Sequence, residues 1–201
     1  CNCLEFLETS PACLKDSGRI FQRWVELLDD SSCKSISAED FKRMLLYCGS
    51  RFRTSVLKRA GEWLGTVDSS GAEVKLRRIR RFFSEIWPRE QIAADQATQV
   101  ALAGLLIRKY RHDLYEDVCP LLNPIRHHHT LYTACLTAVD DRLSDSPKKF
   151  LQLLSAILPE DAKLWPHNCG ELLNRIESLD SSLSSCEAYR RLHALWGKRN
   201  R

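Results

Sequence analysis

Apolar side chains recur along this chain with the period of an α-helix. The first clear stripe is Ile20, Phe21, Trp24, Leu27 and Leu28, which has the i, i+1, i+4, i+7, i+8 spacing of an amphipathic helix. Similar stripes continue to the C-terminus, whereas runs of Val, Ile, Thr and Tyr that would indicate β-strands are nearly absent. The pattern therefore predicts an all-α protein.

The stripes and the residues between them predict about ten helices joined by short loops. Ser37-Ala-Glu-Asp40 resembles a capping box and opens one helix, and Gly49 is placed to end it. The further predicted helices span residues 52–64, 72–86, 90–110, 114–122, 127–142, 147–158, 166–179 and 187–196. Alanines are frequent in 90–110, which makes this helix the candidate for the centre of the core.

Two Trp-Pro pairs, Trp87-Pro88 and Trp165-Pro166, interrupt this pattern. The residue before a proline avoids the α conformation, so each tryptophan should end or interrupt a helix. We expect these two indoles, and that of Trp63, to be buried at helix corners. The distance between the pairs suits two HEAT-type units of roughly 40–47 residues each. An irregular helical-repeat (HEAT/TPR-like) array and a non-repeating α-bundle both remain open.

The whole chain is expected to pack as one continuous helical domain, with an N-terminal part over 1–87 and a C-terminal part over 88–201. It begins at Cys1 without a methionine, which indicates a fragment of a longer polypeptide. No apolar run reaches the roughly 18 residues of a membrane-spanning helix. The first residues also lack the basic and apolar segments of a signal peptide. We therefore expect a cytoplasmic protein that does not contact the membrane.

The sequence lacks the motifs of common enzyme sites. It contains no phosphate-binding loop, no dinucleotide-binding glycine fingerprint, no His-Glu-x-x-His and no Gly-x-Ser-x-Gly. A Cys–His pair formed only in the folded protein is the remaining alternative. We predict no catalytic residues, no cofactor and no enzyme activity.

The chain has nine cysteines and six histidines. A secreted disulfide framework would be shorter and denser in cysteine, so reduced and mostly buried thiols are expected. The two candidate metal clusters are Cys1, Cys3 and Cys13, and His127, His128 and His129 with His167 and Cys169. Neither cluster has the ligand spacing of a structural zinc site. We therefore predict no bound metal.

Positive charge is concentrated between residues 42 and 81. This segment contains eleven Lys or Arg residues and three acidic residues, a net charge of +8, whereas the whole chain carries +4. In the helix predicted over 72–86, apolar residues and arginines fall on opposite sides. The candidate residues for binding an anionic partner are Lys42, Arg43, Lys58, Arg59, Arg77, Arg78, Arg80 and Arg81. A solvated helix face without a ligand is the alternative.

From Phe82 to Leu195 the chain resembles a known group of proteins. The residues that carry the resemblance are the Ile86-Trp-Pro88 break, the stretches 114–125 (LYEDVCPLLNPI) and 148–166 (KKFLQLLSAILPEDAKLWP), and the final 189–196 (YRRLHALW). They are similar to the C-terminal helical-repeat region of large multidomain bacterial defence proteins, of the STAND NTPase-like or sirtuin-associated kind. The resemblance implies that the helical tail recognises a partner while upstream domains carry the chemistry. It offers no catalytic residues.

These observations favour a non-catalytic α-helical interaction or sensor module of a larger cytosolic bacterial protein, with a role in anti-phage defence implied by the resemblance. Its partner would be a protein or another domain of the same polypeptide. The alternative is a helical domain that binds nucleic acid, including DNA, through segment 42–81. No aromatic residue interleaves with the arginines on their exposed side, so the stacking used by single-strand binders is not evident. A third reading is a structural domain that supports oligomerisation.

Overall fold

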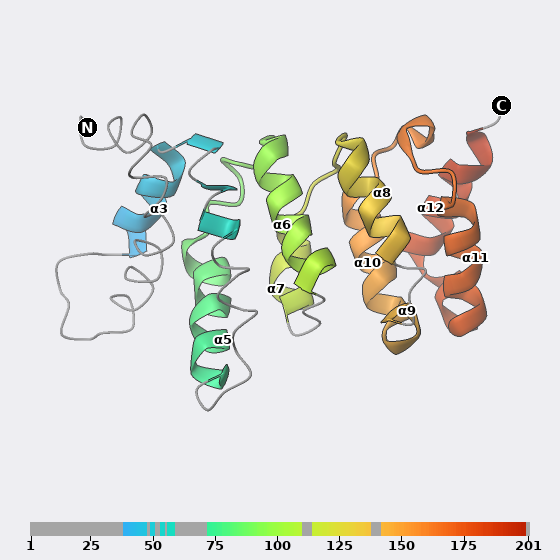
Figure 1. Cartoon of the computed structure of the whole chain (residues 1–201), viewed down its shortest axis with the longest axis horizontal. Coiled ribbons are helices and arrows are strands. Elements are labelled where there is room, and N and C mark those ends of the chain that lie inside the picture. The colour runs from blue at the N-terminus through green and yellow to red at the C-terminus, as the bar shows by residue number, and fades with distance from the viewer. Residues whose placement is uncertain are drawn as a thin grey trace. The chain divides into compact units, whose positions relative to one another are not determined.

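The computed structural model describes residues 38–47, 49–50, 53–54, 56–58, 72–109, 114–137 and 142–199. All regular structure in these ranges is helical and none is strand, so the prediction of an all-α protein is confirmed. The chain divides into two compact units, Cys1–Leu105 and Leu106–Arg201. Figure 1 labels the described helices of each unit. A repeat-like arrangement of these helices stays a prediction.

The described elements of the N-terminal unit are α3 (Ala38–Tyr47), α5 (Ala72–Arg81), the π-helical turn η1 (Phe82–Ile86) and the first part of α6 (Gln96–Lys109). Residues 53–54 and 56–58 are also helical. Gly49, which follows α3, has a φ of 67°, a left-handed conformation that glycine adopts without steric cost. The structure describes α3 as far as Tyr47, and residues 49–50 are helical again, so the stop at Gly49 stays a prediction. The helix α3 packs against η1.

The first Trp-Pro pair ends a helix as predicted. The N–H of Trp87 donates to the carbonyl of Phe82 at 2.9 Å, which closes the π-helical turn, and Trp87 then turns extended with φ −63° and ψ 122°. The rings of Phe82, Phe83 and Trp87 form a cluster with centroids 5.2 to 5.8 Å apart. Trp87 is 3% exposed, so its predicted burial is confirmed. Trp63 lies outside the described residues.

The helix predicted over 90–110 begins later, at Gln96. Residues 89–94 form turns instead. The reason is local, because the Asp95 carboxylate accepts a hydrogen bond from the Thr98 backbone N–H at 3.4 Å and so caps the helix there. The predicted start at residue 90 was wrong, because the helix was extended by its apolar period to residues that precede the capping residue Asp95.

The C-terminal unit contains six α-helices after α6 and three short 3₁₀ turns within the described residues. They are α7 (Tyr115–Val118), η3 (Cys119–Leu121), α8 (His128–Thr137), α9 (Arg142–Asp145), α10 (Pro147–Ile157), η4 (Ala162–Leu164), α11 (Cys169–Leu179), η5 (Ser181–Ser185) and α12 (Glu187–Lys198). The helices α10, α11 and α12 pack against one another. Five residues of α10 face the core: Phe150, Leu151, Leu153, Leu154 and Ile157.

The second Trp-Pro pair also ends a helical turn, and the predicted burial of Trp165 is confirmed. Trp165 is extended and 1% exposed, its indole N–H donates to the Pro159 carbonyl at 2.7 Å, and its ring stacks on Trp196 with centroids 6.2 Å apart. The Cys169 N–H then donates to the Pro166 carbonyl at 3.2 Å, which forms a separate turn. The following helix, α11, therefore begins at Cys169 and not at Pro166.

No helix in the described part of the chain is both long enough and apolar enough to cross a membrane.

Candidate functional site

The arginine-rich side of α5 is the part of the predicted basic surface that the structure describes best. Arg77 and Arg80 are exposed, whereas Ile79 between them is fully buried. Residues three apart on a helix lie on the same side, so these two guanidinium groups point outward together. The helix α3 carries Lys42 and Arg43. It packs against η1, the turn that directly follows α5 in the sequence.

Two of the predicted binding arginines already have an acidic partner one helical turn away. The Arg81 Nε lies 2.8 Å from Glu85 Oε2, and the Arg43 Nε lies 3.7 Å from Glu39 Oε1. Both pairs are largely exposed, so each contributes little to stability but lowers the positive charge at its position. Arg77 and Arg80 are the exposed candidates on α5 itself.

The other predicted binding residues differ in exposure. Lys58 is exposed and Lys42 is half-buried. Arg59 lies outside the described residues, and so does the side chain of Arg78, although its backbone belongs to α5.

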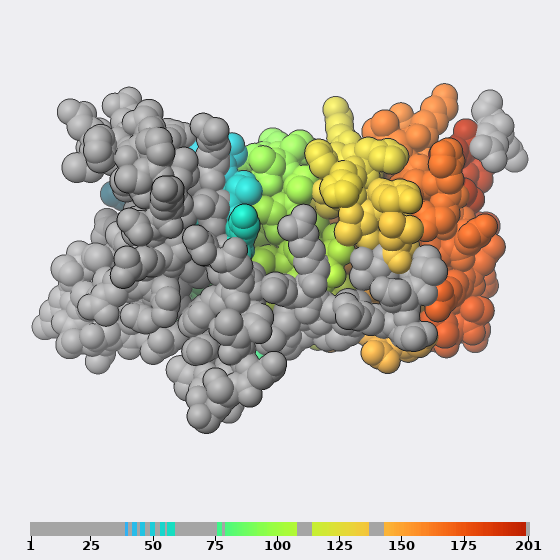
Figure 2. Space-filling view, in the orientation of Figure 1, coloured from blue at the N-terminus to red at the C-terminus, as the bar shows by residue number. Residues whose placement is uncertain are grey.

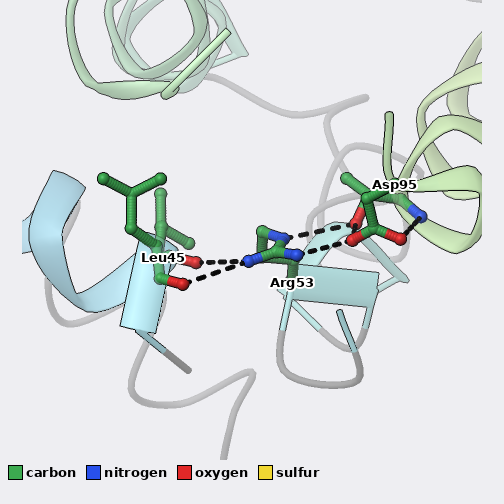
Figure 3. Close-up of polar contacts among 5 residues, drawn as sticks. Leu45, Arg53 and Asp95 are labelled. Atoms are coloured by element: carbon green, nitrogen blue, oxygen red, sulfur yellow. Dashed lines mark hydrogen bonds and ion pairs between the residues drawn. The ribbon is translucent and has the colours of Figure 1, made fainter. Parts of the chain in front are cut away.

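Arg53 does not belong to the surface charges of segment 42–81, because it is only 7% exposed. Its Nη1 donates to the carbonyls of Leu45 and Leu46, at 2.9 and 3.4 Å, which are among the last carbonyls of α3. Its Nη2 lies 2.6 Å from Asp95 Oδ2, and its Nε donates to Thr98 Oγ1 at 3.3 Å. Figure 3 shows the guanidinium between α3 and the start of α6.

The half-buried Asp95 completes this network around Arg53. Burial acts to raise the pKa of Asp95, but hydrogen bonds from Arg53 and Thr98 and the charge of Arg53 outweigh it, so the pKa lies below the ordinary value of 3.8. The Thr98 hydroxyl donates to Asp95 Oδ2 at 2.6 Å. Every polar atom of the cluster faces another protein group, so the arrangement holds helices together. Asp95-Gln-Ala-Thr98 is the signal that a sequence reading could have used, since Asp at the N-cap is common.

A second exposed surface lies on α8. Tyr132 and Leu136 are 45% and 46% exposed, and the Tyr132 ring stacks on the exposed His128 with centroids 6.3 Å apart. Figure 2 shows this helix, in yellow, on the surface of the C-terminal unit. His127 and His129 are exposed as well. Among the described residues, no three His, Cys, Asp or Glu side chains lie close enough to hold a metal ion. The cysteines Cys1, Cys3 and Cys13 lie outside those residues.

Two thiols meet in the interior of the C-terminal unit. Cys135 and Cys169 have their Sγ atoms 3.3 Å apart, and both are buried. The hydrogen bond to Cys169 and burial raise the pKa of Cys135. The half-buried Cys119 has its pKa raised to about 12 by burial alone. The sequence predicts mostly buried thiols and places Cys169 in a candidate metal cluster, but it does not pair Cys135 with Cys169.

No family model, no curated protein and no solved structure matches this chain. The function is therefore argued from the residues themselves.

Proposed function

We propose that the chain is a non-catalytic α-helical interaction module that binds an acidic protein surface through the arginine side of α5. The observation that carries the proposal is that Arg77 and Arg80 are exposed on one side of α5, opposite the buried Ile79. Exposed guanidinium groups form bidentate hydrogen bonds with carboxylates and are enriched in protein interfaces. The wider setting, a sensor segment of a larger cytosolic bacterial defence protein, rests on the sequence resemblance.

The character of the neighbouring side chains favours a protein partner over nucleic acid. The aromatic residues that follow the arginines in η1 and the corner, Phe82, Phe83 and Trp87, are all buried. They are thus not placed to stack on bases, which is how single-stranded nucleic acid is commonly held. Glu85 also stands exposed one turn beyond Arg81, and its carboxylate would repel a phosphate backbone. Carboxylates on a folded partner can avoid such a contact more readily than a continuous phosphate chain.

The proposal is tested by reversing the two exposed charges. A variant with Arg77→Glu and Arg80→Glu is compared with the parent and with a control carrying Arg190→Glu and Lys198→Glu, two exposed positions on α12. The three proteins are immobilised and exposed to nuclease-treated lysate of the source cells. We expect acidic proteins to be retained by the parent and the control, to be released by salt, and to be lost from the α5 variant. Equal retention by all three proteins would contradict the proposal.

The second candidate function is nucleic-acid binding by the same arginine side, which the net charge of +8 over segment 42–81 favours. It is tested by titrating the parent with duplex and single-stranded oligonucleotides at increasing salt. Each phosphate contact lowers log affinity by about 0.7–0.9 per unit of log salt. Binding that weakens with salt and is lost in the α5 variant would favour nucleic acid. If no oligonucleotide binds at about 50 mM salt, where electrostatic binding is strong, nucleic acid is excluded and the protein partner remains.

A further inference from the structure

Cys135 and Cys169 are neighbours only because the chain folds. Cys135 lies in α8 and Cys169 is the first residue of α11, 34 residues later. Their Sγ atoms are 3.3 Å apart, which exceeds the roughly 2.05 Å of a covalent disulfide, so the two groups are free thiols in contact. Cys135 is 0% exposed and Cys169 is 1% exposed.

The residues next to the thiols hold this contact in place. The Asn168 side-chain amide donates to the Cys135 carbonyl at 3.4 Å, which joins the start of α11 to α8. On the other side of Cys169, Gly170 lies so close to the Trp196 ring that a Cβ atom at Gly170 would be 2.7 Å from Cε2 of that ring. The start of α11 is therefore fixed between α8 and α12, and the proximity of the two sulfurs is a property of the packed interior.

We propose that Cys135 and Cys169 form an intramolecular disulfide when a small disulfide oxidant such as oxidised glutathione is present. One protein thiolate attacks a glutathione sulfur, which forms a mixed disulfide and releases one glutathione thiolate. The second protein thiolate then attacks the protein sulfur of the mixed disulfide and releases the other glutathione. The two protein thiols are oxidised, one glutathione disulfide is reduced, and the two protons pass to the released glutathione thiolates.

The burial of the pair determines how the reaction proceeds. The hydrogen bond to Cys169 and burial raise the pKa of Cys135, so a reactive thiolate forms only rarely in the packed pair. An oxidant reaches the pair only when the start of α11 moves away from α8, so the reaction is slow in the native state. The finished disulfide is shielded from reductants in the same way and ties α8 to α11.

The cross-link is tested on the full chain in glutathione buffers of increasing oxidised fraction. Free thiols are alkylated at each step, and digested samples are searched by mass spectrometry for the peptide that joins Cys135 to Cys169. The same oxidation in urea measures how often nine cysteines pair at random. We expect the joined peptide to be enriched by at least about tenfold in the folded protein, because the fold holds the sulfurs together. Cys119→Ala is the matched control and leaves the enrichment unchanged.

A second readout covers the case in which an alanine variant folds poorly. The urea midpoint of the oxidised parent is compared with that of the reduced parent, and the same comparison is made for the protein with both Cys135→Ala and Cys169→Ala. We expect oxidation to raise the midpoint in the parent and in Cys119→Ala but not in the double variant. A joined peptide that is no more frequent in folded than in urea-treated protein would overturn the proposal. An equal midpoint shift in parent and double variant would do the same.

Discussion

At the residue scale, the side chain that organises the N-terminal unit is Arg53. Its guanidinium contacts the end of α3 through the carbonyls of Leu45 and Leu46 and the start of α6 through Asp95 and Thr98. A buried ion pair contributes little net stability relative to an apolar pair, but removal of one partner leaves an uncompensated charge in the interior. Single substitutions in the Arg53 network should therefore lower the free energy of unfolding more than paired substitutions do.

Asp95→Ala should lower the free energy of unfolding by about 3–5 kcal/mol, because Arg53 then remains charged and buried without its carboxylate. The paired change of Arg53→Met with Asp95→Leu should restore much of this loss. Glu39→Ala removes the exposed partner of Arg43 and serves as the control, with an unfolding midpoint close to that of the parent. Urea unfolding followed by circular dichroism measures all three. Equal midpoints for Asp95→Ala and Glu39→Ala would show that the network does not hold the unit together.

The same network predicts a dependence of stability on pH. The pKa of Asp95 is lower in the folded protein than its ordinary value of 3.8, so folding favours the ionised carboxylate. The resulting stabilisation is fully present above pH 3.8 and is lost as the pH falls from there through the lower folded pKa. Asp95→Asn should therefore show a smaller loss of stability below pH 3.8 than the parent. Parallel curves for the two proteins over this range would exclude the contribution of Asp95.

The two corner tryptophans provide a second test at the residue scale. Both rings are buried, but the Trp165 Nε1 donates to the Pro159 carbonyl, whereas the buried Trp87 Nε1 has no hydrogen-bond partner among the described residues. Trp→Phe removes a similar amount of ring from each site. The difference between the two losses of stability therefore measures the hydrogen bond from Trp165 to Pro159. Trp165→Phe should cost roughly 1–2 kcal/mol more than Trp87→Phe. Thermal unfolding of the two variants measures this, and a larger cost at Trp87 would contradict it. Either change to Ala should cost about 3–5 kcal/mol.

At the scale of elements, the helices of the C-terminal unit are joined by a few specific contacts. The Arg191 guanidinium of α12 lies 2.6 Å from Glu160 and donates to the Ser155 carbonyl of α10 at 2.6 Å. The close approach of α11 and α12 depends on Gly170, whose missing Cβ leaves room for the Trp196 ring. The Arg199 guanidinium covers the same ring, 4.7 Å from its centroid. This contact between α11 and α12 therefore depends on one small residue.

Gly170→Ala should destabilise the protein by roughly 1–3 kcal/mol, since the added methyl group overlaps the Trp196 ring and outweighs the better helix propensity of alanine. Gly197→Ala is the matched control within α12, where a Cβ meets nothing within 4 Å. It should stabilise the protein by up to about 1 kcal/mol. Opposite signs in thermal unfolding are expected. If Trp196→Leu does not reduce the cost of Gly170→Ala, the ring is not the obstacle.

At the scale of the whole molecule, stability should be distributed unevenly along the described chain. The helix α10 buries five apolar side chains, whereas η5 is a five-residue 3₁₀ turn in which only Leu183 is buried. Local opening is easiest where few apolar contacts must be broken. Hydrogen exchange should therefore be slow for the amides of α10 and fast for those of η5. Comparable protection of the two elements would contradict this distribution.

Features that depend on neighbours along the chain can be predicted from the sequence alone. The helical period, Pro147 at the first turn of α10 and the two Trp-Pro breaks are local, so the predicted 147–158 agrees with the observed Pro147–Ile157 to one residue. The left-handed conformation of Gly49 has the same local origin. The late start of α6 at Gln96 was also encoded locally, in the Asp95 cap, although the predicted range missed it.

Contacts between residues that are distant in the sequence depend on the packing of the helices. Arg53 reads in the sequence as one more surface charge, but packing places it 2.6 Å from a carboxylate 42 residues away. Cys135 and Cys169 are 34 residues apart in the sequence, and only the fold brings their Sγ atoms to 3.3 Å. Periodicity assigns a residue to a face of its own helix, whereas the partner opposite that face depends on how the helices assemble. That assembly is a property of the whole core, and no short stretch of sequence specifies it.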